Sequence, residues 1–244
     1  MEKVQFDCKE YILYSPDSLK YITDIMIKTL SLKIEEYKEL FNIKDIEKFQ
    51  INYFDDIEKF RNFIYEIRGE EKSLPMYAQG TYDKGMVNAF IHPNIIVGTP
   101  LYYSKVCTAA HELFHILYMK YILNYDYPKR IVWYDEGMAQ FLCGQKDYLD
   151  SDEKFKEYYL SVRKNTKEVP NLNELDHGNK FKNENYDAYD LSYLCIKYLN
   201  ETLTENEFKN LVSNFEKIKE YEEKIITDMF NYYDNKILEN KKSK

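Results

Sequence analysis

The sequence predicts an α+β fold, with strands in the first part of the chain and helices in the rest. Short runs that alternate apolar and polar residues lie before residue 100, whereas later apolar residues recur at helical spacing. The composition agrees, because tyrosine, lysine, asparagine and isoleucine are abundant beside only 7 glycines and 6 prolines. Such a composition favours helix over a β-sandwich. The 244 residues suffice to bury a core as one domain or as two lobes.

Strands and helices are predicted to alternate in the first part. The first helix follows Ser15, an N-cap residue, and begins at Pro16. The second helix ends at Gly69. The predicted strands are residues 4–14, 49–54, 76–82, 86–91 and 95–98, and the two helices are residues 16–41 and 55–68. The first helix should bury Leu19, Ile22, Ile25, Met26, Leu30 and Ile34.

Asp83-Lys84-Gly85 joins two of these strands in a tight hairpin. The hairpin comes shortly before the next helix, so it would place an edge strand beside that helix. Exposed strand edges carry unpaired N–H and C=O groups, which can pair with an extended peptide. The alternative is a hairpin that only completes the sheet.

The next helix, from Leu101 onward, carries His111, Glu112 and His115. The chain has no glycine or proline between residues 101 and 127, which suits a helix. Residues four apart share a helix face, so both histidines can aim a ring nitrogen at one metal ion. Glu112 is rotated by about 100° from His111, which leaves it beside the metal and within reach of a bound water. This is the HExxH pattern of zinc enzymes, in which the glutamate is the general base. The alternative is an amphipathic helix whose histidines make ordinary hydrogen bonds.

A third metal ligand is expected from a second helix in residues 131–142. Two histidines leave zinc short of a protein ligand, and Glu136 lies in the first turns of this helix. Gly137 would let this helix pack closely against the helix of His111. The alternative for Glu136 is an exposed acid favoured by the helix dipole. The apolar residues on both sides of Glu136 argue against exposure.

The segments HELFH and WYDEGMAQF together resemble the gluzincin metallopeptidases. The second segment is similar to the W-x-x-E-G-x-A pattern of peptidase-MA-like and aminopeptidase-N-like domains. The resemblance implies that His111, His115 and Glu136 hold one catalytic Zn²⁺ and that Glu112 is the general base. Gln140 stands where many gluzincins have an acid that orients a histidine ligand, and an amide would do this more weakly.

Asn88-Ala89-Phe90 resembles the substrate-binding edge strand of thermolysin. The resemblance implies that Asn88 and Ala89 bind the backbone of the substrate. Aminopeptidases of this clan carry a Gly-x-Met-Glu-Asn motif, whose glutamate grips the free amine. Gly85-Met86-Val87-Asn88-Ala89 has no acid there, so an endopeptidase is expected rather than an obligate aminopeptidase.

Tyr189 is the candidate for a donor to the oxyanion of a tetrahedral intermediate. It resembles the tyrosine that begins the corresponding helix in leukotriene-hydrolase-like and aminopeptidase-N-like enzymes. The chain has 25 tyrosines, so the alternative is a tyrosine that only packs. Tyr186 and His177 are weaker candidates for the same role. Cys107, one turn before His111, is expected to pack in the core because a catalytic zinc keeps its fourth position for water.

The C-terminal part is predicted to be helical. Helices are expected over residues 150–163 and 186–199, with an irregular polar segment between them, and two more over residues 200–237. Thr204 and Glu207 form a capping box there.

These elements and the resemblance predict a zincin-like α+β fold in one catalytic domain, residues 1–244. An N-terminal α/β lobe, residues 1–123, would hold the small mixed sheet and the HExxH helix, and a helical C-terminal lobe would span residues 124–244. The zinc cleft would lie between the lobes. The expected function is zinc-dependent peptide-bond hydrolysis by Glu-assisted attack of a zinc-bound water. The alternatives are a regulatory protease with one target, and a non-catalytic zincin-shell binding module.

Charge and cysteine usage limit the partners and the compartment. A net charge of −8 argues against nucleic acid as a partner. No apolar run approaches a membrane span, and the N-terminus lacks the apolar region of a signal peptide. The 4 cysteines are scattered without a CxxC pair, as is usual for reduced thiols. A cytoplasmic protein is therefore expected, and the resemblance to metallopeptidases implies that it acts on a peptide or protein.

Overall fold

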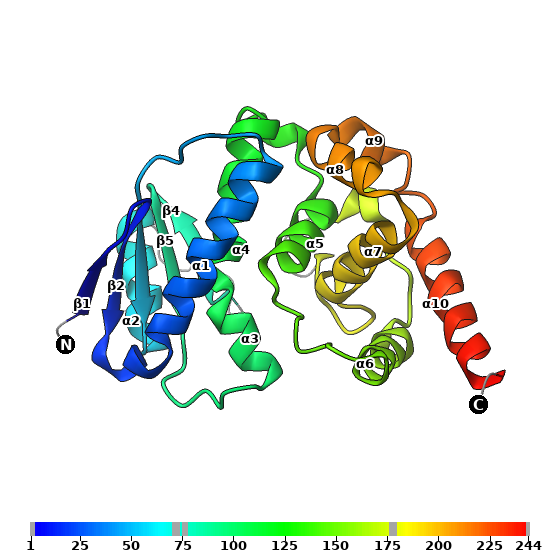
Figure 1. The fold of residues 1–244 in the computed structure, drawn as a ribbon, viewed down its shortest axis with the longest axis horizontal. Coiled ribbons are helices and arrows are strands. Elements are labelled where there is room, and N and C mark those ends of the chain that lie inside the picture. Colours follow the sequence, from blue (N-terminus) through cyan, green and yellow to red (C-terminus); the bar gives the residue numbers. More distant parts are fainter. Residues whose placement is uncertain (1–2, 70–73, 75–77, 176–179, 243–244) are drawn as a thin grey trace. The chain divides into compact units, whose positions relative to one another are not determined.

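The computed structural model describes residues 3–69, 74, 78–175 and 180–242, and the chain forms two compact units (Figure 1). The first unit consists of residues 1–117 with 142–146, and the second of residues 118–141 with 147–244. The first unit holds a five-stranded sheet, and the regular elements described in the second are helices. The predicted α+β class is confirmed.

The sheet has the strand order β1-β2-β3-β5-β4. The three middle strands are parallel, and each outer strand is antiparallel to its neighbour. The strand predicted over residues 4–14 is in fact two strands, because the chain turns after Asp7 and the Cys8 N–H bonds the Tyr11 carbonyl at 2.9 Å. The strands are β1 (Lys3–Asp7), β2 (Tyr11–Pro16), β3 (Phe49–Phe54), β4 (Gly80–Asp83) and β5 (Met86–Phe90).

The predicted hairpin is present between β4 and β5. Lys84 and Gly85 have φ values of 48° and 81°, the two left-handed residues of a type I′ turn. The first strand of the predicted hairpin was expected to begin at Met76, which lies outside the described residues. The strand predicted over residues 95–98 is wrong, because this segment is a turn that closes at Gly98 with φ 83°.

Asn88 and Ala89 lie on β5, which is an inner strand. β5 pairs with β3 on one side and with β4 on the other, and both side chains are fully buried. The prediction that these residues lie on an exposed strand edge is therefore wrong. In the part of the chain that the structure describes, the outer strand of the hairpin is β4. A hairpin sequence does not reveal which of its strands a third strand will join, and here β3 joins the second.

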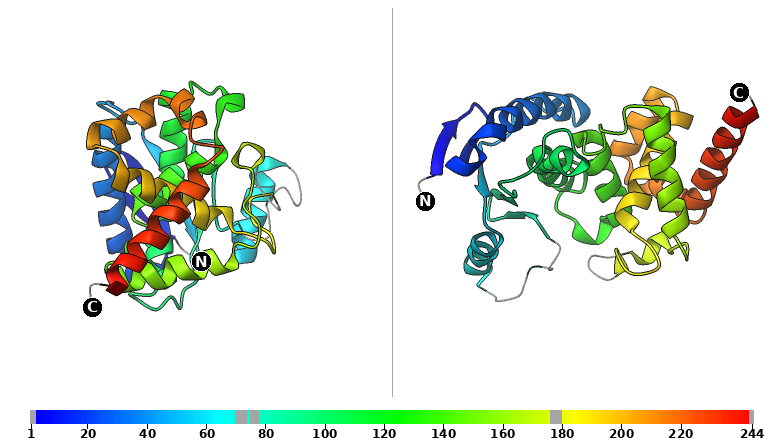
Figure 2. Two further views of the ribbon diagram at one scale, coloured as in Figure 1. Left: turned by 90° about the vertical axis from the view of Figure 1, so that its right-hand side faces the viewer. Right: turned by 90° about the horizontal axis from the view of Figure 1, so that it is seen from below.

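Helices cover both faces of the sheet, with α1 on one face and α2 on the other (Figure 2, right). The helix α1 (Lys20–Leu40) also packs against α4 (Thr108–Leu117), and α2 (Ile57–Arg68) packs against the last three strands of the sheet order. The short helix α3 (Pro100–Val106) precedes α4. The Asp56 side chain caps α2, and Gly69 ends it with φ 73°, as predicted.

The start of α1 differs from the prediction. Pro16 still belongs to β2, and a short 3-10 turn, Asp17–Leu19, leads into the helix. The Ser15 hydroxyl bonds the Thr23 hydroxyl at 3.1 Å instead of capping the helix. Ile25 is 41% exposed, since it lies beside the buried stripe rather than on it. The predicted residues that are buried are Leu19, Ile22, Met26, Leu30 and Ile34.

The second unit is built around α7 (Ala188–Thr202). This helix contacts α6 (Asp152–Asn165), α8 (Glu205–Ser213) and α10 (Ile225–Lys242). The capping box of Thr204 and Glu207 is confirmed at the start of α8. A further short helix, α9 (Phe215–Lys219), makes three helices where two were predicted.

The helix α5 (Val132–Cys143) packs closely on α7 at Gly137. A Cβ atom at this position would lie 2.7 Å from the Ser192 carbonyl oxygen and 2.8 Å from the Ile196 side chain. Glycine is needed for close packing, as predicted, but the neighbours that a Cβ would meet belong to α7. The prediction had assigned this contact to the helix of His111.

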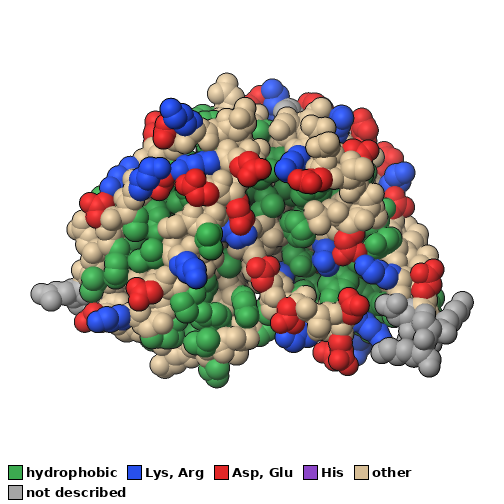
Figure 3. Space-filling model, in the orientation of Figure 1, with side chains coloured by type: hydrophobic (Ala, Val, Ile, Leu, Met, Phe, Trp, Pro, Cys, Tyr) green, Lys and Arg blue, Asp and Glu red, His purple; other side chains and the backbone are tan. Residues whose placement is uncertain are grey.

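Acidic and basic side chains are interspersed on the face drawn in Figure 3. This face therefore carries no broad area of a single charge. No helix among the described residues has both the length and the apolar character needed to cross a bilayer.

Candidate metal centre

The orientation of α4 is set by a stripe of buried residues along one side. Phe114 packs against the rings of Tyr37 on α1 and of Phe41 directly after α1, with centroids 5.8 and 5.6 Å away. The opposite stripe is half-buried and holds His111, Glu112 and His115. The buried stripe is Ala109, Ala110, Leu113, Phe114 and Leu117. Burial of this apolar stripe leaves the three polar side chains at the surface of the unit that α4 belongs to.

The two histidines converge. Their Nε2 atoms are 3.0 Å apart, and the ring centroids are 4.7 Å apart with an interplanar angle of 84°. A tetrahedral ion with bonds of about 2.0 to 2.1 Å separates its nitrogen ligands by about 3.3 Å. The helix is shorter than predicted, because α3 ends at Val106, with Cys107 as its C-cap, and α4 begins at Thr108.

Glu136, on α5, completes a group of three. One ligand atom from each of His111, His115 and Glu136 lies within 4.8 Å of the others, so the group could hold a metal ion. Glu136 is buried, and the histidines are half-buried. Two imidazole nitrogens and one carboxylate oxygen are a donor set that suits zinc with one position left open. The residue types do not by themselves select zinc over Co²⁺ or Mn²⁺.

Glu112 lies against the start of β4. A Cβ atom at Gly80 would be 2.6 Å from the Glu112 Oε1 and 2.9 Å from the Thr108 methyl group. Real Cβ atoms do not approach so closely, so only glycine fits here without a shift of its neighbours. The carboxylate of the candidate general base therefore touches the backbone of the outer strand.

Arg130 connects the Glu136 carboxylate to Asp135. Its Nε donates to Asp135 Oδ2 at 2.5 Å, and its Nη2 donates to Glu136 Oε1 at 3.2 Å. Burial lowers the pKa of Arg130, but the Asp135 and Glu136 carboxylates outweigh burial and raise it. Asp135 has no exposed surface, so it is a fully buried ion-pair partner.

Gln140 and Tyr189 lie close to each other within the second unit. The Gln140 amide nitrogen donates to the Tyr189 carbonyl at 3.0 Å and weakly to the Glu136 carbonyl at 3.4 Å. The Tyr189 N–H bonds the Asp187 carboxylate, which caps α7. The Tyr189 ring is half-buried and packs edge-on against Phe181 at 4.6 Å. Gln140 thus fixes the backbone from which Tyr189 extends.

The weaker candidates have other surroundings. The Tyr186 hydroxyl donates to the Lys180 carbonyl within its own loop. The His92 Nδ1 accepts the Asn94 N–H at 3.1 Å. Cys107 is buried, in keeping with its predicted packing role. His177 lies outside the described residues.

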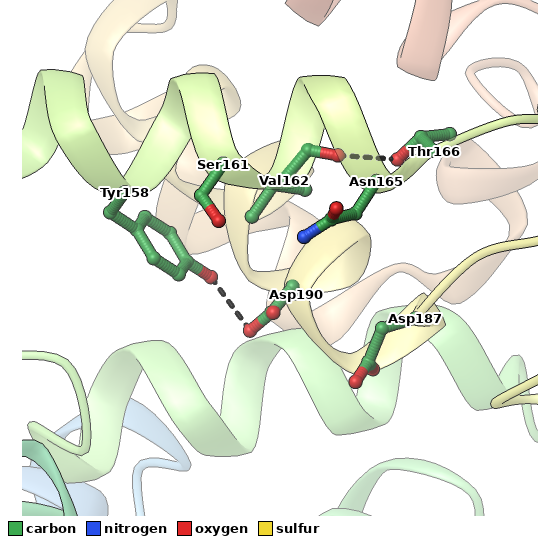
Figure 4. A pocket seen from close by; sticks show the side chains of 7 residues that line it. All are labelled: Tyr158, Ser161, Val162, Asn165, Thr166, Asp187 and Asp190. Carbon is green, nitrogen blue, oxygen red and sulfur yellow. Dashed lines mark hydrogen bonds between the residues drawn. The ribbon is translucent and has the colours of Figure 1, made fainter. Parts of the chain in front are cut away.

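A small pocket of about 170 Å³ lies between α6 and the start of α7 (Figure 4). Figure 4 shows the Tyr158 hydroxyl donating to Asp190, at 2.8 Å. Asp187 lies at the other end, where it also pairs with Lys182. None of the predicted site residues lines this pocket; its lining is Tyr158, Ser161, Val162, Asn165, Thr166, Asp187 and Asp190.

Two residues of the centre are absent from the sequence prediction. Gly80 carries a recognisable signal, because a glycine within a strand often marks a close approach of another group. Arg130 carries almost no such signal in the sequence, since the order of residues does not reveal which carboxylates an arginine will contact after folding.

No protein-family model and no curated protein matches the chain. A crystal structure of an aminopeptidase N family protein from Idiomarina loihiensis is similar to it, with a TM-score of 0.49 and 14% sequence identity. The similarity covers 92% of this chain, which spans 41% of that protein.

Proposed function

We propose that this protein is a zinc-dependent peptidase with a zincin-like fold. The observation that carries the proposal is the group of His111, His115 and Glu136, with Glu112 on the same helix as the two histidines. A purely structural metal site has no use for a carboxylate directly beside its ligands. The combination of three ligands and an adjacent base is the arrangement that hydrolysis requires.

When bound, a zinc ion held by these three residues would polarise the scissile carbonyl and make water more acidic. Glu112 would take the proton of the attacking water and deliver it to the leaving amine. Its carboxylate lies against Gly80 at the start of β4. Tyr189 is proposed to donate to the oxyanion, and Gln140 holds the backbone that presents it.

The substrate is proposed to pair with β4 as an added strand. β4 is the outer strand among the described residues, and Gly80 at its start touches the carboxylate of Glu112. Asn88 and Ala89 cannot take this role through strand addition, because both edges of β5 are already paired. β4 replaces them in the proposal.

We propose an endopeptidase rather than an aminopeptidase. The carboxylate of the β4–β5 hairpin is Asp83, and Arg68 binds it through two nitrogens, at 2.7 and 3.1 Å. A carboxylate held in this way is a poor partner for the free amine of a substrate. The proposed substrate is accordingly an internal stretch of a peptide or protein, met in the cytoplasm.

The test is cleavage of a diverse peptide mixture by zinc-loaded protein, with products identified by mass spectrometry. The matched samples are the Glu112→Gln variant and chelated wild type. Internal cuts are expected in the wild-type sample, and a loss of at least about 100-fold is expected in the variant, since general bases contribute about 10² to 10⁴. Full activity of Glu112→Gln would refute this mechanism.

The other outcomes separate the remaining functions. Removal of single N-terminal residues would mean an aminopeptidase, despite the pairing of Asp83. Absence of cuts, with one zinc bound per chain, would favour a protease with a single target or a non-catalytic binding module. Cleavage of one specific protein partner would then distinguish these two.

A further inference from the structure

We propose that Arg130 is a positioning residue that holds Glu136 ready to bind the metal through one carboxylate oxygen. The inference rests on the metal centre proposed above. Asp135 holds Arg130, and Arg130 holds Glu136, so that the ligand carboxylate is fixed before an ion arrives.

The guanidinium joins the two carboxylates rigidly. Its Nε is 2.5 Å from Asp135 Oδ2, and its Nη2 is 3.2 Å from Glu136 Oε1. The guanidinium is planar, so the directions of these two donors are fixed relative to each other. Asp135 is fully buried and cannot exchange Arg130 for water. The position of Glu136 Oε1 therefore follows from that of Asp135.

The backbone around this contact is also fixed. The Arg130 N–H bonds the Tyr127 carbonyl at 3.0 Å, which closes the 3-10 turn Tyr127–Lys129. The Asp135 N–H bonds the Ile131 carbonyl at 3.0 Å at the start of α5. Arg130 and the two acids thus extend from a short, hydrogen-bonded segment.

A cation beside a metal ligand also repels the metal, so the sign of its effect must be considered. Arg130 carries Asp135 with it, and this pair has no net charge. The field of the pair therefore falls off faster with distance than that of a lone cation, and we expect the orientation of Glu136 to be the larger effect. Partners of this kind usually contribute about 10- to 100-fold to metal affinity.

The informative variant is Arg130→Met combined with Asp135→Asn, because it removes both charges of the pair together. Zn²⁺ affinity is measured by competition with a chromophoric chelator, and the coordination of Co²⁺ is measured by visible absorption. We expect zinc affinity to fall by about 10- to 100-fold. The Co²⁺ absorption should weaken, because a released carboxylate can bind through both oxygens and raise the coordination number.

Two single variants serve as reference points. Arg130→Lys keeps the charge but loses the fork of donors, so we expect it to recover only part of the affinity. Lys129→Met is the matched control, since Lys129 is exposed and pairs with Asp126 at 2.8 Å. It removes a positive charge from the same turn and should leave affinity and spectrum unchanged.

An unchanged affinity and Co²⁺ spectrum in the double variant, folded by circular dichroism, would overturn the inference. If the double variant does not fold, the Arg130→Lys variant provides the test. Zinc affinity and a Co²⁺ spectrum equal to those of the wild type in Arg130→Lys would then overturn the inference. Failure of the peptidase proposal is a separate result, because an inactive wild type can still bind Co²⁺ and show the dependence on Arg130.

Discussion

The position of the Glu112 carboxylate in the candidate metal centre depends on the absence of a side chain at Gly80. This carboxylate occupies the space that any side chain at position 80 would need. The contact ties the candidate base to the outer strand, along which a substrate is proposed to lie. The two residues are separated by 32 positions in sequence, so their interaction can be measured as a coupling between two substitutions.

Gly80→Ala should destabilise the protein, because the added Cβ would meet both the Glu112 carboxylate and the Thr108 methyl group. Overpacking of this kind costs about 1 to 3 kcal/mol. In a Glu112→Ala background the nearest clash, at 2.6 Å, is removed, so the same substitution should cost clearly less. Urea unfolding of the four proteins measures the coupling. Equal costs in both backgrounds would mean that the carboxylate moves aside freely.

The candidate ligand group, which could hold a metal ion, could be selected from the sequence because its pattern is local or its residue types are distinctive. His111, Glu112 and His115 follow the period of a helix, and the chain has only 4 histidines. Glu136 stands in an apolar segment where an exposed acid would be out of place. The pairing of Arg130 depends on where a loop side chain points after folding, and no local pattern contains that information.

Among the elements of the sheet, the wrong prediction that Asn88 lies on an exposed strand edge has a clear physical reason. Asn88 resembles a substrate-binding asparagine, but its amide is part of a chain of bonds inside the sheet. Asn52 on β3 donates to Asn88 at 2.9 Å, and Gln50 donates to Asn52 at 2.8 Å. A buried amide must be hydrogen-bonded, and neighbouring strands meet this need here. The order of the strands places Asn88 on an inner strand, and the sequence does not reveal that order.

The helix α3 buries a lysine, an unusual feature for so polar a side chain. Lys105 is 5% exposed, and its ammonium donates to the Gln79 side chain just before β4. Burial lowers the pKa of Lys105 from 10.5 to about 8. At neutral pH the folded protein therefore holds a poorly solvated charge, which favours the unfolded state.

Lys105→Met should stabilise the protein at pH 7, and this advantage should shrink as pH rises from about 8 to 10.5. Over that range the unfolded wild type binds more protons than the folded wild type, so wild-type stability increases relative to the variant. The lowered pKa of Lys105 corresponds to at most about 3 kcal/mol, less the lost bond to Gln79. Chemical denaturation at several pH values measures the difference. Lys28, exposed on α1, provides the control variant Lys28→Met, whose difference from wild type should stay constant.

For the whole molecule, the distribution of strands and helices was predictable from the sequence. The division into one catalytic domain with lobes at residues 1–123 and 124–244 stays a prediction. The compact units of the structure, residues 1–117 with 142–146 and residues 118–141 with 147–244, depend on contacts between distant residues, which a pass along the sequence does not reveal. Local periodicity, in contrast, suffices to tell the sheet-forming part from the helical part.

The candidate metal group depends on more than one part of the chain, since the histidines lie on α4 and Glu136 lies on α5. Unfolding of either helix would disperse the ligands, so an ion that binds them must stabilise the folded chain. At a zinc concentration of 100 times Kd the gain is about 2.7 kcal/mol. For a chain of this size that corresponds to a rise in Tm of about 5 to 10 °C.

Calorimetry with and without zinc tests whether ion binding to this group stabilises the folded chain. The two variants to compare replace glutamates with different proposed roles. Glu112→Gln should show the full rise in Tm, because it keeps all three ligands. Glu136→Gln should show little or none, because an amide oxygen is a much weaker ligand than a carboxylate. A chelated sample of each protein sets its baseline, which removes any effect of the substitution itself. An equal rise in both variants would show that zinc binds elsewhere and that Glu136 is not a ligand.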